Sequence, residues 1–317
     1  MGLALWCTGV PLVLLLIRKY REHIWGYCRD WRSQKNRVFI VTGASSGLGK
    51  ETVKELASRG ARVVMACRDM EKAKEVILDI RSSIQTGELI PMELELGSKD
   101  SIMKFADEVL KSFPKVHVLI NNAGLSVPPT LNRRTVDGIE INFGVNYLGH
   151  YFLTELLLER LKESAPSRIV FVTSKLLEGG MIDFETIKGD KKFPVGRRNQ
   201  AYNNSKLAQM YYCRELSKRL DNKGVEVYGV CPGFCYTDLF RYSKLKWFQY
   251  LLFLPIAFFF LRRPCNGCQT ILHCALSDDV QGFSGNVFRD CKLDKVNYIF
   301  EEETENKLAQ ISKQLMF

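Results

Sequence analysis

The chain has 317 residues, of which 46% are hydrophobic and 25% are charged. This composition is close to that of an average soluble protein, and it excludes a disordered chain and a polytopic membrane protein. The net charge is +10, but residues 18–37 alone hold seven basic and two acidic side chains. A local patch of this kind argues against a nucleic-acid partner and is typical of a segment beside an anionic membrane surface.

The N-terminus combines an apolar run, residues 3–17, with a basic cluster that starts at Arg18. A cleaved signal peptide has its basic residues first, so this order predicts an uncleaved hydrophobic anchor over residues 1–20 and a basic linker over 21–35. The basic flank predicts that the catalytic domain faces the cytosol. As a helix the run spans only about 22 Å. We therefore expect the endoplasmic reticulum membrane or an interfacial helix, with a lipid droplet, a mitochondrial membrane or a buried core helix as alternatives.

From residue 36 onward, short apolar runs alternate with helical patterns. Strands are predicted at 37–42, 61–67, 89–96, 116–122, 168–174, 225–231 and 285–288. Helices are predicted between them, up to 59 and at 69–86, 99–113, 138–163, 201–220 and 264–277. Apolar strands that alternate with helices indicate a parallel sheet covered on both faces. Right-handed crossovers then give one doubly wound, Rossmann-type α/β domain over 36–317. Residues 175–200 lack periodicity, which is typical of a functional or disordered loop.

Ten cysteines are spread along the chain, and several lie within apolar strand or helix patterns. This distribution favours reduced thiols in a cytosolic compartment over a disulfide framework. Cys265 and Cys268 have the spacing of one half of a zinc site, but no second pair follows at the expected distance. Because structural zinc normally takes four ligands, we predict no metal site.

The first predicted strand ends in a glycine-rich turn, Thr42-Gly43-Ala44-Ser45-Ser46-Gly47-Leu48-Gly49. Glycines allow the backbone to approach a pyrophosphate closely, and the helix that follows offers free N–H groups to the phosphates. In this position, between a first strand and a helix, the turn predicts a dinucleotide-binding site.

The second predicted strand ends at Cys67-Arg68-Asp69, where the adenosine ribose lies in this architecture. An acidic residue there binds a 2′-hydroxyl, whereas an arginine accommodates a 2′-phosphate. Arg68, with Lys50 assisting, therefore favours NADP(H) over NAD(H). Asp69 leaves the alternative open, and so does the interpretation of Arg68 as a surface residue.

Tyr202 and Lys206 lie four residues apart on a predicted helix and so share one face. A phenol has a pKa near 10, and an adjacent ammonium would lower it by stabilising the phenolate. Such a tyrosine can exchange a proton with an alcohol or carbonyl oxygen. By itself the pair is a weak signal, but it follows the glycine-rich turn, Asn-Asn-Ala-Gly at 121–124, Asn146 and Ser174 in one consistent order.

Over residues 36–290 the chain resembles the short-chain dehydrogenase/reductase superfamily and is most similar to its retinol dehydrogenase branch. The most specific stretches are VFIVTGASSGLGKETVKELASRGARVVMACRD, VHVLINNAG, DGIEINFGVNYLGHYFLTELLL, APSRIVFVTS, AYNNSKLAQMYYCRELSKRL and CPGFCYTDL. Three departures from the family concern the substrate side more than the hydride chemistry. These are Glu95 in place of an aspartate, Cys231 where this branch often has histidine, and Lys175 after Ser174.

The resemblance implies a role for each matching residue. Tyr202 would be the acid and base, Lys206 would lower its pKa and bind the nicotinamide ribose, and Ser174 would hold the substrate oxygen. Asn146 would position a water in a proton relay. The implied cofactor-binding residues, besides Arg68, Tyr202 and Lys206, are Gly43, Ser45, Ser46, Gly47, Leu48, Gly49, Asn122, Ala123, Gly124, Pro232, Gly233 and Thr237.

A second apolar run, 247–261, follows the predicted nicotinamide loop and is flanked by basic residues. It suits a helix in the membrane interface, with a buried lid or a homodimer surface as alternatives. The combined prediction is a membrane-anchored, NADP(H)-dependent oxidoreductase that interconverts apolar alcohols and carbonyls. Retinol and retinal are the expected substrates, and steroids or lipid aldehydes are alternatives. A non-catalytic dinucleotide-binding sensor or scaffold is the alternative from another class.

Overall fold

The computed structural model describes residues 2–188, 199–237, 239, 257–296 and 298–316, with side chains from residue 13 onward. Its centre is an eight-stranded sheet in the order β3-β2-β1-β4-β5-β6-β7-β8. The strands are β1 (Val38–Thr42), β2 (Arg62–Cys67), β3 (Glu88–Glu93), β4 (Val118–Asn121), β5 (Ser167–Val172), β6 (Val225–Cys231), β7 (Val287–Arg289) and β8 (Lys292–Leu293). All neighbours pair in parallel except β7 and β8, which are antiparallel. The strand order reverses between β1 and β4, where ligands bind in doubly wound sheets.

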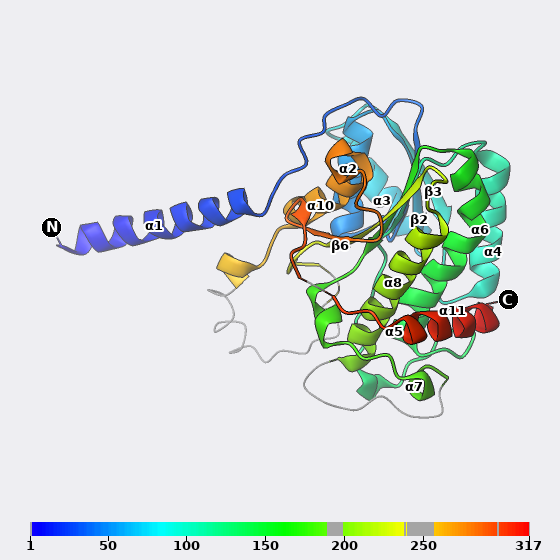
Figure 1. Cartoon of the computed structure of the whole chain (residues 1–317). Coiled ribbons are helices and arrows are strands. Elements are labelled where there is room, and N and C mark those ends of the chain that lie inside the picture. The colour runs from blue at the N-terminus through cyan, green and yellow to red at the C-terminus, as the bar shows by residue number, and fades with distance from the viewer. Residues whose placement is uncertain (1, 189–198, 238, 240–256, 297, 317) are drawn as a thin grey trace.

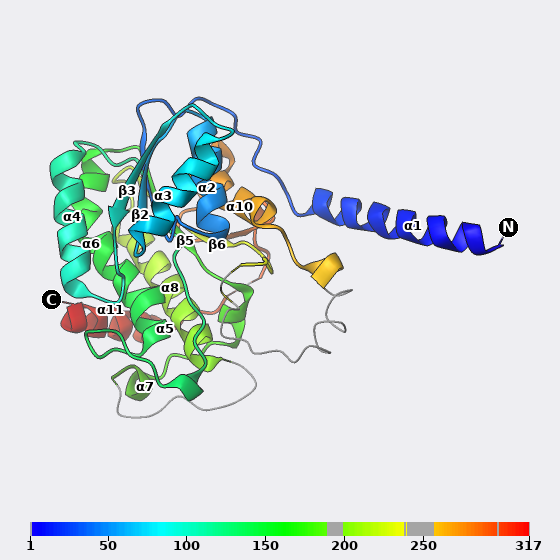
Figure 2. The same ribbon diagram turned by 180° about the vertical axis from the view of Figure 1, so that it is seen from behind.

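Helices cover both faces of the sheet (Figure 1, Figure 2). One face packs against α2 (Gly47–Ser58), α3 (Met70–Arg81) and α10 (Pro264–Leu276). The other packs against α4 (Lys99–Ser112), α6 (Gly149–Glu163), α8 (Gln200–Arg219) and α11 (Glu302–Met316). Successive residues of β1 point into opposite cores, since Ile40 belongs to the second and Val41 to the first. This two-sided burial is why the strands are apolar throughout, and the predicted Rossmann-type fold is confirmed.

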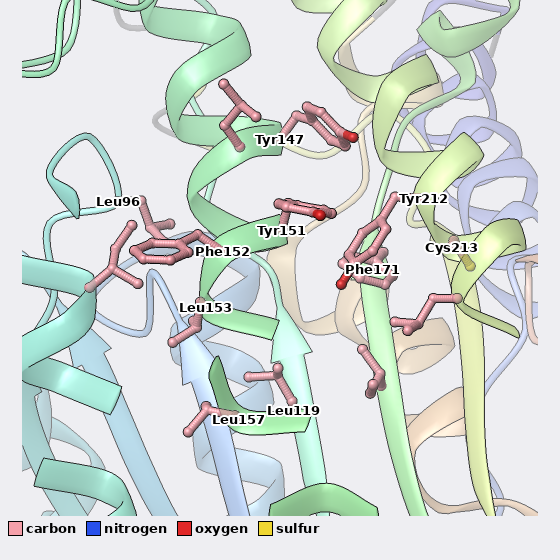
Figure 3. Packing of buried hydrophobic residues seen from close by; sticks show 14 of the residues in the cluster. Leu96, Leu119, Tyr147, Tyr151, Phe152, Leu153, Leu157, Phe171, Tyr212 and Cys213 are labelled. Atoms are coloured by element: carbon pink, nitrogen blue, oxygen red, sulfur yellow. The ribbon is translucent and has the colours of Figure 1, made fainter. Parts of the chain in front are cut away.

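Aromatic side chains form the part of the core between α6, α8 and β5 (Figure 3). The rings of Tyr151 and Tyr212 have centroids 4.7 Å apart, and those of Phe171 and Tyr212 lie 5.6 Å apart. Tilted and edge-on ring pairs add to the free energy gained by burial. The cluster fixes α8 against the sheet, and α8 carries the predicted catalytic pair.

The helix predicted over 138–163 is divided in the structure. It begins with α5 (Ile141–Phe143), continues as a π-helical segment, η2 (Gly144–Leu148), and ends as α6. Single π turns inside helices often accompany functional sites, and this one contains Asn146. Periodicity averaged over a long segment does not resolve one irregular turn, so the sequence prediction missed it.

Other segments also differ from the sequence prediction. Residues 175–188, expected to be irregular, contain η3 (Lys175–Gly179) and α7 (Phe184–Lys188), while 189–198 lie outside the described residues. The C-terminal α11 was not predicted; its Leu308 and Ile311 are buried, and Ser312 lies 2.7 Å from the Tyr147 hydroxyl oxygen. The remaining short elements are η1 (Pro129–Leu131) and η5 (Asp278–Val280).

The N-terminal helix α1 (Gly2–Ile24) projects away from the domain (Figure 1, Figure 2). It continues past residue 20, where the sequence analysis ended the anchor. Among the helices of the described residues, none is both long and apolar enough to cross a membrane. The chain then runs along the domain surface, with Trp25 and Cys28 buried and the Cys28 amide donating to Gln269 Oε1 at 3.2 Å.

Candidate active site

The glycine-rich turn joins β1 to α2 and packs too closely for side chains. A Cβ atom on Gly49 would lie 2.2 Å from the carbonyl oxygen of Gly43, and one on Gly43 would lie 2.9 Å from the Cα atom of Ala123. Ser46, at the N-terminus of α2, makes no side-chain capping bond. The first turn of α2 therefore keeps N–H groups and its positive dipole end available for an anion.

The end of β2 carries the residues that are expected to contact the adenosine half. Asp69 caps α3, since its carboxylate accepts from the Lys72 amide at 3.0 Å. Arg68 is exposed and lies 3.4 Å from Glu95 across the cleft. Lys50 does not assist Arg68 as expected, because it pairs with Asp79 at 2.8 Å and does not line the cleft. Lys72, which sequence reasoning did not single out, does line it.

The Asn-Asn-Ala-Gly segment after β4 is held by the last residue of β1. The Thr42 Oγ1 atom accepts from the backbone amides of Asn122 and Ala123, both at 2.9 Å. The Asn122 side chain donates to the Thr42 carbonyl at 2.8 Å. Two strand ends are thus tied together at the switch point of the sheet, and this leaves Gly124 exposed at the cleft.

Ser174, Tyr202 and Lys206 come together at the carboxyl end of β5. Ser174 follows this strand, and its hydroxyl hydrogen-bonds with Tyr202. Asn199 caps α8 by accepting from the Tyr202 amide at 3.2 Å. Lys206, one turn further along α8, donates to the Val172 carbonyl at 2.7 Å. The spacing of four residues places both side chains on one face of α8, as the sequence pattern predicts.

Burial perturbs both members of the Tyr202–Lys206 pair. It raises the pKa of Tyr202, which the Ser174 hydrogen bond opposes in part, and it lowers the pKa of Lys206 to about 7. The expected lowering of the Tyr202 pKa by Lys206 is therefore not found among these side chains. The reason is that burial disfavours the charged form of each group. Perturbed pKa values in a cleft are typical of functional sites.

Asn146 does not line the cleft; it is fully buried behind it. Its side chain accepts from the Leu125 amide and donates to the Leu125 carbonyl, both at 2.9 Å, and donates to Ser205 at 3.0 Å. These bonds tie the segment after β4 to α8. The side chain thus supports the site, and the predicted water relay remains untested.

The loop after β6 closes the opposite side of the cleft. A Cβ atom on Gly47 would lie 3.1 Å from Thr237, so the two loops meet there. Behind the loop, the Arg262 guanidinium donates to the Pro232 carbonyl at 3.3 Å. A Cβ atom on Gly233 would lie 2.6 Å from this guanidinium, so the loop packs directly against Arg262.

Ser174 and the predicted cofactor-binding residues line a single cleft of about 360 Å³. Gly49 is an exception among the predicted cofactor-binding residues, because it packs beneath the turn. Asp69 and Glu95, both considered in the sequence analysis, line the cleft as well. Further lining residues that the sequence analysis did not assign are Thr42, Ala66, Cys67, Leu94, Leu96, Leu125, Ser126, Val145, Val172, Thr173, Leu176, Phe234, Cys235 and Leu239. Most of them lie beside a motif residue at a strand end, and that position is the signal that could have found them.

The cysteine pair on α10 has ordinary structural surroundings. Cys268 is fully buried, and its thiol donates to the Cys265 carbonyl at 3.2 Å, while Cys265 is exposed. Within the described parts of the chain, no three metal-ligating side chains come together.

Comparison with known proteins agrees with this geometry. The sequence pattern of the family described as short chain dehydrogenase matches residues 37–246. The chain belongs to the short-chain dehydrogenase family. Retinol dehydrogenase 11 from Homo sapiens is 43% identical over 305 residues, which cover 93% of this chain and 92% of that one. Retinol dehydrogenase 12 from Mus musculus is 43% identical over 267 residues, covering 84% and 82%.

Two solved structures share the fold of this chain. A protein from Mycobacterium paratuberculosis superimposes with a TM-score of 0.67 and 30% identity, covering 92% of this chain and 97% of its own. RhlG from Pseudomonas aeruginosa, solved as a complex with NADP, has a TM-score of 0.65 and 23% identity, covering 81% and 95%. The family match and the retinol dehydrogenase relatives show that this short-chain dehydrogenase is an oxidoreductase, as the motifs predicted.

Proposed function

We propose that this short-chain dehydrogenase is an NADP(H)-dependent oxidoreductase that interconverts an apolar alcohol and its carbonyl compound, with retinol and retinal as the first candidates. One observation carries the proposal. Ser174, Tyr202 and Lys206, on two different elements, line the same cleft as the glycine-rich turn. A proton donor and a phosphate cradle in one cleft are what hydride transfer from a dinucleotide requires.

The chain's own residues would hold the substrate and move one proton. When bound, the nicotinamide supplies the hydride that reaches the carbonyl carbon. Ser174 would hold the carbonyl oxygen by a hydrogen bond, and the Tyr202 hydroxyl would donate its proton to that oxygen. Because its pKa is raised by burial, Tyr202 carries this proton throughout the neutral pH range. Lys206 would bind the nicotinamide ribose and compensate the charge left on Tyr202.

Two features of the cleft support a dinucleotide with a 2′-phosphate as the cofactor. The space beside Gly43 and Gly47 and the uncapped N-terminus of α2 suit a pyrophosphate. Arg68 extends into the adenosine end of the cleft, whereas the Asp69 carboxylate is engaged by its own helix. One oxygen of the Asp69 carboxylate caps α3, and the exposed Arg68 guanidinium beside it suits a 2′-phosphate, which supports NADP(H). RhlG, which has the same fold, was solved with NADP.

An apolar substrate is supported by the lining and by the relatives. Leu125, Val145, Leu176 and Phe234 line the same cleft as Ser174 and Tyr202, and Leu176 and Phe234 are partly exposed. Relatives at about 40% identity are named retinol dehydrogenases. Steroids and lipid aldehydes would suit the same lining and are the alternative substrates.

We also propose that α1 attaches the enzyme to a membrane with the catalytic domain in the cytosol. The aliphatic side chains of residues 13–17 are exposed. Arg18 donates to the carbonyls of Phe258 and Leu261, the latter at 2.9 Å, and Arg21 lies 4.5 Å from the Phe260 ring centroid. Exposed apolar side chains beside basic ones are typical of interfacial helices. The short apolar run favours the endoplasmic reticulum.

Most of the second apolar run, 247–256, lies outside the described residues. Residues 257–261 are described, and both Phe258 and Phe260 are partly exposed beside α1. An interfacial helix, a lid and a homodimer surface therefore remain alternative predictions for this run. Vesicle flotation and the oligomeric state in detergent would separate them.

The proposed activity is tested by NADPH oxidation with detergent-solubilised protein. The substrates are all-trans-retinal, a steroid ketone and a medium-chain aldehyde, and Tyr202→Phe is the matched variant. We expect retinal turnover by the wild type and a loss of at least about 100-fold in kcat for the variant, with NADPH affinity retained. If the wild type and the variant both bind NADPH but neither reduces any of the three substrates, the result would instead support the dinucleotide-binding sensor or scaffold.

A further inference from the structure

His150 is a fully buried histidine that the proposed mechanism does not use. It lies on α6, one turn after Asn146. Its Nδ1 atom is 2.9 Å from the Asn146 carbonyl oxygen, and its Nε2 atom is 2.9 Å from Thr42 Oγ1. The imidazole thus joins the last residue of β1 to the π turn, two places that the sequence separates by about a hundred residues.

The surroundings of Thr42 fix the tautomer of His150. Thr42 Oγ1 already accepts from the amides of Asn122 and Ala123, so it can only donate to a further partner. The two available acceptors are His150 Nε2 at 2.9 Å and the Ile120 carbonyl at 3.4 Å. The shorter contact makes Nε2 the acceptor, and Nδ1–H then donates to the Asn146 carbonyl.

The imidazole must be neutral for Nε2 to accept while Nδ1–H donates, and its surroundings keep it neutral. Burial, together with the charge of Lys206, lowers the pKa of His150 to about 3, and the hydrogen bond to the Asn146 carbonyl opposes this shift only in part. The ring therefore keeps one donor and one acceptor at any pH at which the enzyme works.

The Asn146 carbonyl connects His150 to the catalytic lysine through Gln209. The Gln209 side-chain nitrogen donates to the Asn146 carbonyl at 3.4 Å, and the Gln209 side-chain oxygen accepts from Lys206 Nζ at 3.3 Å. A continuous series of hydrogen bonds thus runs from the backbone of Asn122 and Ala123 to Lys206. Its inner members, Thr42, His150, Asn146 and Gln209, are all fully buried.

We propose that His150 is a positioning residue that holds the cofactor-binding segment after β4 and the Lys206 ammonium in their working positions. The proposal rests on the function proposed above, which places the cofactor and Lys206 in one site. A side chain needed only for packing would be apolar here, because a buried polar group is unfavourable unless its partners are in place. Both nitrogens of His150 are paired, and the two bonds lead to different parts of the site.

Two variants each keep one of the two hydrogen bonds of His150 and remove the other. His150→Asn places an amide nitrogen near the Nδ1 position, so the bond to the Asn146 carbonyl is kept and the acceptor for Thr42 is lost. His150→Gln carries its amide oxygen out to the Nε2 position, so the acceptor for Thr42 is kept and the donor to Asn146 is lost. His150→Phe removes both bonds, and His273→Phe on α10 is the control for the loss of a buried histidine.

The readouts are the Kd for NADPH, measured by fluorescence, and kcat with retinal. We expect His150→Asn to raise the Kd about tenfold with kcat within about threefold, and His150→Gln to lower kcat about tenfold with the Kd little changed. His150→Phe should show both losses, and His273→Phe should show neither.

Two results would overturn the inference in different ways. If the wild type binds NADPH and reduces retinal while all His150 variants share its Kd and kcat, the imidazole is a packing residue and only this inference fails. If the wild type neither binds NADPH nor turns over any carbonyl, the proposed function fails and the inference with it. The Asn and Gln variants keep a polar group at the site, so the test does not depend on the folding of His150→Phe.

Discussion

Replacement of Arg68 by alanine tests the cofactor assignment directly. The Arg68 guanidinium lies at the adenosine end of the cleft with 69% of its side chain exposed. A hydrogen bond to a charged group contributes about 1.5–3 kcal/mol when it is shielded from solvent, and exposed ion pairs contribute about 1 kcal/mol or less. We expect about 1.4 kcal/mol for this partly exposed contact, which corresponds to a tenfold weaker affinity for NADPH.

The neighbouring side chains sharpen this prediction. Glu95 is 3.4 Å from Arg68 and competes with a 2′-phosphate for the guanidinium. Glu95→Gln should therefore tighten NADPH binding about twofold to threefold by removing the competing charge. Lys50, which pairs with Asp79 outside the cleft, supplies the matched control, and Lys50→Ala should leave the affinity for NADPH unchanged.

The assay is fluorescence titration of each protein with NADPH and with NADH. Arg68→Ala should weaken NADPH binding alone, because NADH has a hydroxyl at the 2′ position. The NADPH preference of the wild type should also fall as salt is raised from about 50 to 500 mM, since exposed charges are screened. An unchanged ratio of the two affinities in Arg68→Ala would refute the assignment of Arg68 to the 2′-phosphate.

Three further predictions concern other parts of the molecule. Burial lowers the pKa of Lys206 to about 7, whereas a lysine in the unfolded chain titrates near 10.4. Between these two pH values the unfolded chain binds one more proton than the folded chain, so the free energy of unfolding rises with pH, by up to about 1.4 kcal/mol per pH unit. Urea denaturation at pH 7, 8 and 9 should show this rise in the wild type and not in Lys206→Met. Gly49→Ala should lower stability by about 1–3 kcal/mol and abolish NADPH binding, because its Cβ atom would lie 2.2 Å from the Gly43 carbonyl oxygen; a variant with wild-type Tm and affinity would contradict the close packing of the turn. Paired Leu16→Ser and Ile17→Ser changes remove exposed apolar side chains from α1 and should weaken flotation with anionic vesicles at least tenfold; full flotation would exclude α1 as the attachment site.

Periodicity and short motifs were sufficient to predict most of the fold. Seven strands and the helices between them follow from apolar runs that alternate with amphipathic ones, since a strand buried on both faces has no polar side. The short β8 and the C-terminal α11 escaped prediction. Strand β8 has only two residues. Helix α11 is mostly polar, and its few apolar side chains are buried by contact with α8, a neighbour that the sequence does not reveal.

The parts of the site that depend on residues close together in the sequence could be predicted. The glycine-rich turn, the Tyr202–Lys206 pair and Arg68 were expected in one site because a tight turn, a helix face and a strand end each leave a pattern within a few residues, and they line one cleft. Lys50 was misassigned because the choice between Asp79 and the cleft is made by the direction of a side chain. The bond from the Lys72 amide places Asp69 at the start of α3, and the preference for NADP(H) over NAD(H) stays a prediction.

The sequence alone therefore determined the class of fold, the family and the residue types in the cleft, since these depend on periodicity and on motifs. Only the tertiary structure decided which side chains meet. The series from Thr42 through His150 and Gln209 to Lys206 joins three separate segments. Burial, which sets the direction of every pKa shift in the site, is likewise a property of the assembled layers of helix and sheet.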